Sequence, residues 1–274
     1  MTLGIDIGGT TISLGLIQEA QVVRKICVPS FPANATLDQT MTYLGDRIAE
    51  ILVPEVERIG IGVPSVVDPV KGIVYNAMNI ASWDVVPLKE RMEARFGIPV
   101  FVNNDANCYA LGAAALVRKP AQVLVCVTLG TGTGVGIVHE GKLFAGTHCG
   151  AGEIGALPYG DGIYEACCSK QFFTGKGWDC KALSQKAEAG DEQALALFRE
   201  FGRHMGSFLS VVMLAYDPDC IVLGGGVAHT FPLFSATLWE ALRSEFPYPT
   251  ALENLVIEPM PNADVALVGA AALS

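Results

Sequence analysis

The sequence predicts an α/β protein made of two lobes, and three observations support this prediction. Apolar runs of strand length alternate along the chain with stretches that have helical spacing. Hydrophobic residues make up 51% of the chain and charged residues only 17%, with 30 glycines, which is typical of a well-packed chain with many tight turns. The length of 274 residues allows one large domain or two modest lobes, and we expect two lobes.

The first half of the chain reads as a sheet with crossover helices. A helix is expected at 37–52, where the apolar residues have helical spacing, and an Ala-rich helix is expected directly after Asp105. A short amphipathic stretch lies at 88–96. Strands are expected at LGIDIGG (3–9), ISLGLIQ (12–18), VVRKICV (22–28), RIGIGVP (58–64), GIVYNA (72–77) and PVFVNND (99–105).

A second set of strands and helices follows, without a Ser- or Pro-rich linker before it. Strands are expected at 122–132, 135–141, 220–226 and 254–259, and helices at 191–216, 233–246 and 265–273. We therefore expect an N-terminal small lobe at 1–105 and a larger C-terminal lobe at 106–261, joined by a hinge. The last helix, at about 262–274, is expected to complete the first lobe.

Charge and composition argue against several classes of protein. The net charge is −10 and the basic residues are scattered singly, so we expect no nucleic-acid partner. The apolar runs are too short to span a bilayer, and Met1 leads directly into a strand without a leader pattern, so neither membrane insertion nor export is expected. Several of the eight cysteines lie inside apolar runs, which fits a reduced, cytoplasmic protein.

A Gly/Thr-rich turn after the first strand is a candidate phosphate site. Gly8, Gly9, Thr10 and Thr11 follow Asp6, and backbone N–H groups and hydroxyls in such a turn can converge on an anion. A carboxylate so close to phosphates makes sense if Asp6 holds Mg²⁺, usually through water. The alternative is that the two glycines mark an ordinary hairpin.

A second turn repeats this arrangement, because GIDIGGTTISLGL and VTLGTGTGVGIV resemble each other. The second turn offers Gly130, Thr131, Gly132 and Thr133, so two such turns can hold two phosphate groups. The chain contains no GxxxxGK[ST] motif, and its glycine runs do not fit GxGxxG. Nucleotide sites of the P-loop and dinucleotide-binding types are therefore disfavoured.

Two further motifs follow strands. Asn104 and Asp105 come at the end of a strand and before a helix, where catalytic groups are common in α/β proteins, although Asp105 could merely cap that helix. Gly225 and Gly226 belong to a glycine run that permits close backbone approach to a flat ligand such as adenine, or that forms only a tight turn.

The order of the motifs IDIGGTT, IGVPSVVD, NNDAN, VTLGTGTGVGIV, AGEIG and VLGGGV resembles that of the ROK family of sugar kinases, over nearly the whole chain. The resemblance is closest to the bacterial glucokinase-like members. It implies an actin-like (ribonuclease H-like) ATPase fold with two lobes, ATP and sugar in the cleft between them, and Mg²⁺ as cofactor. It also implies a homodimer.

The resemblance implies a role for each matching residue. Asp105 matches the catalytic base and Asp6 lies near the metal. The expected sugar ligands are Asn79, Asn104, Asp105, Glu153 and Glu165, of which Glu165 depends on the alignment across a gap. The expected ATP and phosphate residues are Gly8, Gly9, Thr10, Thr11, Gly130, Thr131, Gly132, Thr133, Gly225 and Gly226.

The chain departs from the family between Glu153 and Glu165. Most members have a His after the EIG triplet and a cysteine-rich zinc motif in a longer loop, whereas this chain has Ala156 and a shorter segment without cysteine. His148, Cys149, Cys167 and Cys168 lie nearby without zinc-ligand spacing, so we expect no zinc. We then expect packing by Leu157, Tyr159, Ile163 and Tyr164 to hold the loop. Two departures from the family leave the identity of the sugar open. One is Ala156, and the other is Ser65, where members often have Gly.

The leading expectation is an ATP-dependent hexose kinase that forms hexose 6-phosphate and ADP, with glucose as the first substrate. Kinases for N-acetylmannosamine, allose, fructose or a β-glucoside are alternatives. A further alternative is a non-catalytic sugar-sensing regulator. ROK repressors, however, carry a DNA-binding segment before the kinase-like part, whereas here the phosphate motif starts within the first ten residues. A catalytically silent sugar-binding protein is disfavoured by the presence of Asp6, Asp105 and both phosphate turns.

Overall fold

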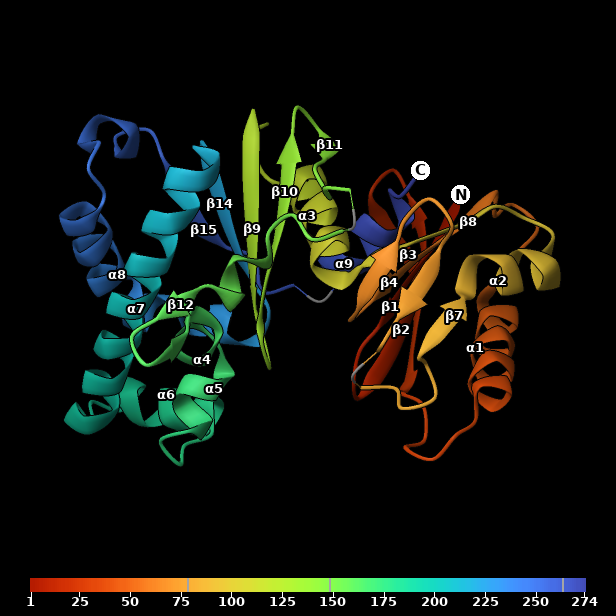
Figure 1. Cartoon of the computed structure of the whole chain (residues 1–274), viewed down its shortest axis with the longest axis horizontal. Helices are drawn as coiled ribbons and strands as arrows, with labels where there is room; N and C mark the ends of the chain where they lie inside the picture. The colour runs from red at the N-terminus through yellow and green to blue at the C-terminus, as the bar shows by residue number, and fades with distance from the viewer. Residues whose placement is uncertain (78, 148, 263) are drawn as a thin grey trace. The chain divides into compact units, whose positions relative to one another are not determined.

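The computed structural model describes residues 1–77, 79–147, 149–262 and 264–274. The chain divides by its contacts into two compact units (Figure 1). The first contains residues 1–120, 141–151 and 263–274, and the second contains 121–140 and 152–262. Within the described residues, none of the helices combines the length and the apolar character that crossing a membrane requires.

The first unit is built on a five-stranded sheet in the order β3-β2-β1-β4-β8. The strands β2 and β3 extend β1 as an antiparallel meander, whereas β4 and β8 run parallel to β1. A small antiparallel sheet of three short strands follows β4 along the chain. The strands are β1 (Thr2–Ile7), β2 (Thr11–Gln18), β3 (Gln21–Pro29), β4 (Arg58–Val63), β5 (Val66–Asp68), β6 (Ile73–Tyr75), β7 (Val85–Pro87) and β8 (Val100–Asn104).

The helices of the first unit begin and end where the sequence provides caps. Helix α1 (Leu37–Ile51) begins with a capping box in which Thr36 and Gln39 bond each other's backbone N–H groups. Helix α2 (Leu88–Phe96) ends at Gly97, whose backbone has the left-handed conformation. In the core beside α1, the buried Trp83 indole donates to Thr40 Oγ1 at 2.8 Å.

Helices α3 (Asp105–Leu116) and α9 (Asp264–Ala271) pack on one another through glycines, although about 150 residues separate them in sequence. A Cβ atom built on Gly112 would overlap the Val265 carbonyl, and one on Gly269 would overlap the Cys108 carbonyl. Gly4 of β1 and Gly60 of β4 face the α9 backbone in the same way. The C-terminal helix therefore lies directly on the backbone of β1, β4 and α3.

The second unit is also an α/β layer structure. Its sheet contains β10-β9-β14-β15 in that order, with β10 antiparallel to β9 and with β14 parallel to both β9 and β15. The strands are β9 (Val123–Leu129), β10 (Thr133–His139), β14 (Cys220–Gly224) and β15 (Val256–Pro259). The two-residue strand β11 (Lys142–Leu143) follows β10 along the chain.

Two long helices, α7 (Glu192–Tyr216) and α8 (Phe231–Glu245), lie side by side in the second unit (Figure 1). Their close approach is possible because Gly202 and Gly206, four residues apart on α7, face α8 without side chains. Shorter elements precede α7: the β12–β13 hairpin (Pro158–Tyr159 and Gly162–Ile163), α4 (Tyr164–Cys168), α5 (Lys170–Thr174) and α6 (Cys180–Glu188). Three 3-10 helices complete the unit: η1 (Glu153–Ala156), η2 (Gly226–Thr230) and η3 (Pro249–Leu252).

The structure contains the main expected strands and helices, but its units differ from the lobes expected from the sequence. The expected boundary at residue 105 separates α3 from the first sheet. By contacts, α3 and residues 141–151 group with the first unit, because α3 packs on α9 and that helix packs on β1 and β4.

Candidate active site

The turn between β1 and β2 is closed by backbone and side-chain hydrogen bonds. Gly8 N–H donates to Thr11 O at 2.9 Å. Ser30, directly after β3, donates through its backbone N–H to Thr10 O at 2.9 Å and through its hydroxyl to Gly8 O at 2.8 Å. Gly9, Thr10 and Thr11 remain exposed to solvent. These hydrogen bonds fix the turn, and its exposed residues can contact a ligand.

Asn79 lies beside this turn. A Cβ atom built on Gly9 would stand 3.5 Å from the Asn79 side-chain amide, so the amide lies within van der Waals distance of the turn. One expected sugar ligand and one expected phosphate residue are thus neighbours within the first unit.

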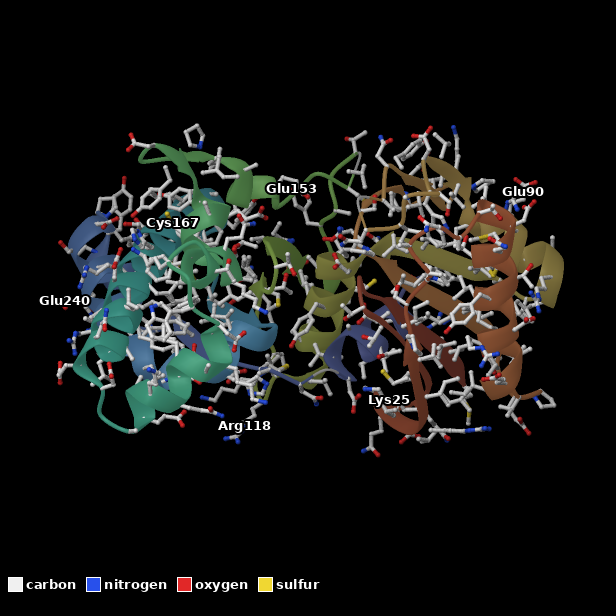
Figure 2. All side chains as sticks on the ribbon, turned by 90° about the horizontal axis from the view of Figure 1, so that it is seen from below. Lys25, Glu90, Arg118, Glu153, Cys167 and Glu240 are labelled. Carbon is white, nitrogen blue, oxygen red and sulfur yellow. The ribbon has the colours of Figure 1, made fainter. Side chains whose placement is uncertain are left out.

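Asp6 is a half-buried carboxylate at the end of β1. Burial raises the pKa of Asp6 to about 6, and the positive charge of Lys25 partly opposes this shift. The Lys25 ammonium itself pairs with Asp264 at 2.7 Å; Lys25 is marked in Figure 2. A carboxylate at this position suits Mg²⁺, which takes one or two protein carboxylates and completes its shell with water and phosphate oxygens.

Asp105 and Asn104 lie where β8 passes into α3. The Asn104 Oδ1 atom accepts the N–H groups of Ala106 and Asn107 at 2.9 and 3.3 Å, so Asn104 is the N-cap of α3. Asp105 is the first residue of that helix, and its Oδ1 atom accepts from Ala106 N–H at 2.8 Å. The cap role that was open for Asp105 thus falls chiefly to Asn104, whose Nδ2 also donates to Ser65 O at 3.2 Å.

Two residues that we did not single out in the sequence hold this corner together. The buried Asn103 Oδ1 atom accepts from Asn104 N–H at 2.8 Å, from Asn107 Nδ2 at 3.0 Å and from Cys149 Sγ at 3.4 Å. Asn103 and Asn107 both lie within the NNDAN motif, and the structure shows that both are buried. Their hydrogen bonds fix the backbone from which Asp105 projects.

Asp6 and Asp105 both lie close enough to the buried Cys108 thiol to affect its pKa. Strand register places Gly62 of β4 opposite Asp6 on one side and opposite Asn103 on the other. Burial raises the pKa of Cys108, and the negative charges of Asp6 and Asp105 raise it further. The two carboxylates therefore flank one small region at the carboxyl end of the sheet in the first unit.

The second unit contains a cavity of about 730 Å³ beside the residues Gly130–Thr133, which we call the phosphate loop. The loop is a tight turn in which Gly130 N–H donates to Gly132 O at 3.0 Å. The cavity is lined by Leu129, Gly130, Thr131, Lys170, Asp179, Cys180, Lys181, Ser184, Gln185, Glu188, Gly226, Val227, His229 and Thr230. Three of the expected ATP residues, Gly130, Thr131 and Gly226, thus share one cavity.

Gly225 shapes the wall of this cavity without lining it. Its φ angle is +78°, a conformation that favours glycine, and a Cβ atom there would stand 2.5 Å from Leu129 O at the end of β9. Glycine at 225 therefore allows the chain to turn tightly from β14 into the 3-10 helix η2 beside the phosphate loop.

The two expected sugar carboxylates of the second unit are close enough to interact. Burial raises the pKa of Glu153, and the charge of Glu165 raises it further. Glu165 is half-buried, and its Oε2 atom accepts from Thr133 N–H at 3.1 Å. Glu153 comes from η1 and Glu165 from α4, and Figure 2 shows Glu153 and the α4 residue Cys167 on the same unit.

An aromatic cluster holds the segment between these two glutamates. The Tyr159 and Tyr164 rings stack with centroids 4.2 Å apart, and Tyr159 Oη lies 3.0 Å from His204 Nδ1 on α7. Burial lowers the pKa of His204, which favours a neutral ring. The other two residues expected to hold the loop, Leu157 and Ile163, are exposed at 42% and 38%, so the tyrosines carry the packing.

Metal ligands do not gather in the described part of the chain. Groups of three or more His, Cys, Asp or Glu with suitable placement do not occur among these residues. His148 lies outside the described residues, and Ala156 is exposed. The expectation that the protein needs no zinc stays a prediction.

The structure thus gathers the expected site residues into two groups. The first unit contains Asp6, Gly8, Gly9, Thr10, Thr11, Asn79, Asn104 and Asp105, and the second unit contains Gly130, Thr131, Gly132, Thr133, Glu153, Glu165, Gly225 and Gly226. The first group combines carboxylates and side-chain amides with a Gly/Thr turn, and the second combines two carboxylates with a Gly/Thr turn. Carboxylates and amides suit hydroxyl groups, and such turns suit phosphate.

The chain is similar in sequence and structure to known sugar kinases. A glucokinase of Streptomyces coelicolor is 31% identical over 267 residues, covering 83% of this chain and 82% of that protein. An N-acetyl-D-glucosamine kinase of Pasteurella multocida is 30% identical over 269 residues, covering 86% and 87%. The crystal structure of a ROK family glucokinase from Streptomyces griseus, in complex with glucose and AMPPNP, superposes with a TM-score of 0.82 at 28% identity, covering 100% and 98%.

These similarities confirm the resemblance seen in the motifs, and the fold is the actin-like ATPase fold of these kinases. The sequence pattern of the ROK family matches residues 2–274, which is essentially the whole chain. The chain therefore belongs to the ROK family.

Proposed function

We propose that the protein transfers the γ-phosphoryl group of ATP to a hydroxyl of a hexose, with Asp105 as the base. The enzyme class is that of an ATP-dependent carbohydrate kinase, as in the ROK relatives named glucokinase. The observation that carries the residue assignment is the corner at β8 and α3, where the Asn103 and Asn104 side chains hold the backbone on either side of the half-buried Asp105. A base in a fixed position can take a hydroxyl proton as the phosphoryl group is transferred.

The nucleotide is proposed to bind in the cavity of the second unit. Gly130 and Thr131 of the phosphate loop line this cavity, where the Thr131 hydroxyl can donate to phosphate, and the Gly225–Gly226 turn permits a flat base to approach. The turn at Gly8–Thr11 supplies a second set of hydroxyl and N–H donors. Asp6 would hold Mg²⁺, which when bound neutralises charge on the phosphate oxygens.

The sugar is proposed to bind to Asn79, Asn104, Asp105, Glu153 and Glu165, whose amides and carboxylates can pair with vicinal hydroxyls. Glucose is the first candidate, since relatives at about 30% identity include glucokinases. N-acetyl-D-glucosamine is a second, because another relative at 30% carries that name. The earlier alternatives, the homodimer and the cytoplasmic location stay predictions.

A coupled assay of ADP release tests the proposal across a panel of hexoses and amino sugars. We expect turnover with at least one sugar, at a rate well above hydrolysis of ATP without sugar. A chain that binds a sugar but releases ADP with none of the panel would favour a sugar-sensing regulator and would remove the kinase assignment.

A further inference from the structure

The segment 165–171, which spans the end of α4 and the start of α5, contacts every residue of the phosphate loop, and we call it the brace. At the first loop residue, Lys170 N–H donates to Gly130 O at 2.9 Å. At the second, Gln171 Nε2 donates to Thr131 O at 3.1 Å. The brace therefore holds the first half of the loop through the carbonyl groups of Gly130 and Thr131.

The second half of the loop is held by Glu165 and Cys168. A Cβ atom on Gly132 would overlap the Glu165 carboxylate, so the carboxylate lies directly against the loop backbone. Thr133 N–H donates to Glu165 Oε2 at 3.1 Å, and the buried Thr133 hydroxyl donates to Cys168 O at 2.9 Å. The N–H and hydroxyl groups of Thr133 are thus both used within the protein. The loop residues that line the cavity are Gly130 and Thr131.

Gln171 closes this network. Its Nε2 atom donates to Glu165 Oε1 at 3.1 Å as well as to Thr131 O, so both amide hydrogens have acceptors. Glu165 is thereby fixed to the loop from two sides, through Thr133 and through Gln171. A carboxylate that serves a sugar would in this arrangement also serve the phosphate loop.

We propose that Glu165 and Gln171 couple hexose binding to nucleotide binding within the second unit. This inference rests on the proposed function, in which Glu165 binds sugar and the loop binds phosphate. A hexose hydroxyl bonded to Glu165 restricts the carboxylate, which in turn restricts Thr131 and Thr133. The nucleotide then meets a loop that is already ordered and loses less conformational entropy on binding, so each ligand strengthens the binding of the other.

Calorimetry of the full chain tests this coupling. The dissociation constant of magnesium AMPPNP is measured with and without saturating hexose, using the sugar that gives the highest turnover. The coupling factor is the dissociation constant without hexose divided by that with hexose. We expect a factor of about five or more in the wild type. The test variants are Gln171→Met, which keeps the length and helix preference of the side chain but removes its donors, and Gln171→Glu, which repels Glu165.

The control is Gln193→Met, at an exposed glutamine on α7 outside the brace. We expect the coupling factor to fall about threefold or more in both Gln171 variants and to stay unchanged in the control, with melting temperatures confirming that all three fold. An unchanged factor in Gln171→Met, or a wild-type factor of one while both ligands bind, would overturn the coupling and leave the kinase proposal standing. A wild type that binds neither ligand would overturn both.

Discussion

Gly62 leaves the space that the Cys108 thiol occupies beneath the carboxylates. A Cβ atom on Gly62 would stand 3.2 Å from Cys108 Sγ and 3.7 Å from the Asp105 Cα atom. Since Gly62 pairs with Asp6 across the sheet, one small residue sets the spacing between β1 and the start of α3.

Gly62→Ala is expected to destabilise the protein by about 1–3 kcal/mol and to lower kcat more than it changes the KM values, because it crowds Cys108 on α3, the helix that begins with Asp105. Chemical denaturation and steady-state kinetics measure the two effects. Adding Cys108→Ala should restore part of the stability, whereas strictly additive losses would contradict the contact. Gly162→Ala, where a Cβ atom meets nothing within 4 Å, is the control.

Asp105→Asn is expected to lower kcat by roughly 10²–10⁴-fold while nucleotide binding is retained, because the base is lost and the phosphate turns are unchanged. The asparagine keeps an Oδ1 acceptor for Ala106 N–H, so the start of α3 should persist. Kinetics and AMPPNP titration measure the two effects, with Asp38→Asn in the first turn of α1 as the control. Turnover close to that of the wild type would leave Asp105 with a purely structural role.

Asp6→Asn is expected to stabilise the metal-free protein at pH 8 by about 2–3 kcal/mol, since the folded state holds a carboxylate whose pKa is raised to about 6. A raised carboxyl pKa means that stability falls as the pH rises from about 4 through 6. The gain in melting temperature over the wild type should therefore be largest at pH 8 and vanish near pH 4.

Melting curves in a chelator measure this difference, and the exposed Asp84→Asn is the control. A gain that does not depend on pH would show that the charge of Asp6 is not its cause. The same variant should lose activity and show an altered Mg²⁺ titration if Asp6 holds the metal.

Glu153→Gln is expected to weaken sugar binding by about 1.5–3 kcal/mol and nucleotide binding far less, because a charged acceptor for a sugar hydroxyl becomes neutral. Separate calorimetric titrations of the sugar and of AMPPNP measure the two losses. Equal losses for both ligands would assign Glu153 to the scaffold.

The purified protein is expected to contain no stoichiometric zinc and to keep its melting temperature in a chelator. The Tyr159–Tyr164 stack and the Tyr159–His204 contact hold the segment where the family resemblance would place a zinc motif. Elemental analysis and thermal unfolding test this. About one zinc per chain, or a large loss of stability on chelation, would show that a replacement site exists.

The sequence predicted the elements whose pattern is local. The apolar runs at 12–18 and 22–28 predicted β2 and β3, and the Ala-rich stretch after Asp105 predicted α3. Helices α4 and α5 were missed because five residues each are too few to show a helical period. The place of α3 in the first unit was missed because it depends on Gly112 and Gly269, which lie far apart in sequence.

The candidate site shows the same limit. Motif order singled out Asp105 and Glu165 as candidates, but it did not show which residues hold them in place. The contact from Glu165 to Thr133 spans 32 residues, and the amide network of Asn103 and Asn107 depends on burial that a single sequence does not reveal.

The glycine contacts of α9 have a consequence for the order of folding. The strands β1 and β4 are made early in synthesis, yet the helix that covers Gly4 and Gly60 is at residues 264–271. Contacts of such high sequence separation form slowly, because a long loop must close first. We expect the first unit to stay incompletely folded on the ribosome until the whole second unit has been synthesised, and a chain stalled before residue 264 to expose the apolar face that α9 covers to chaperones.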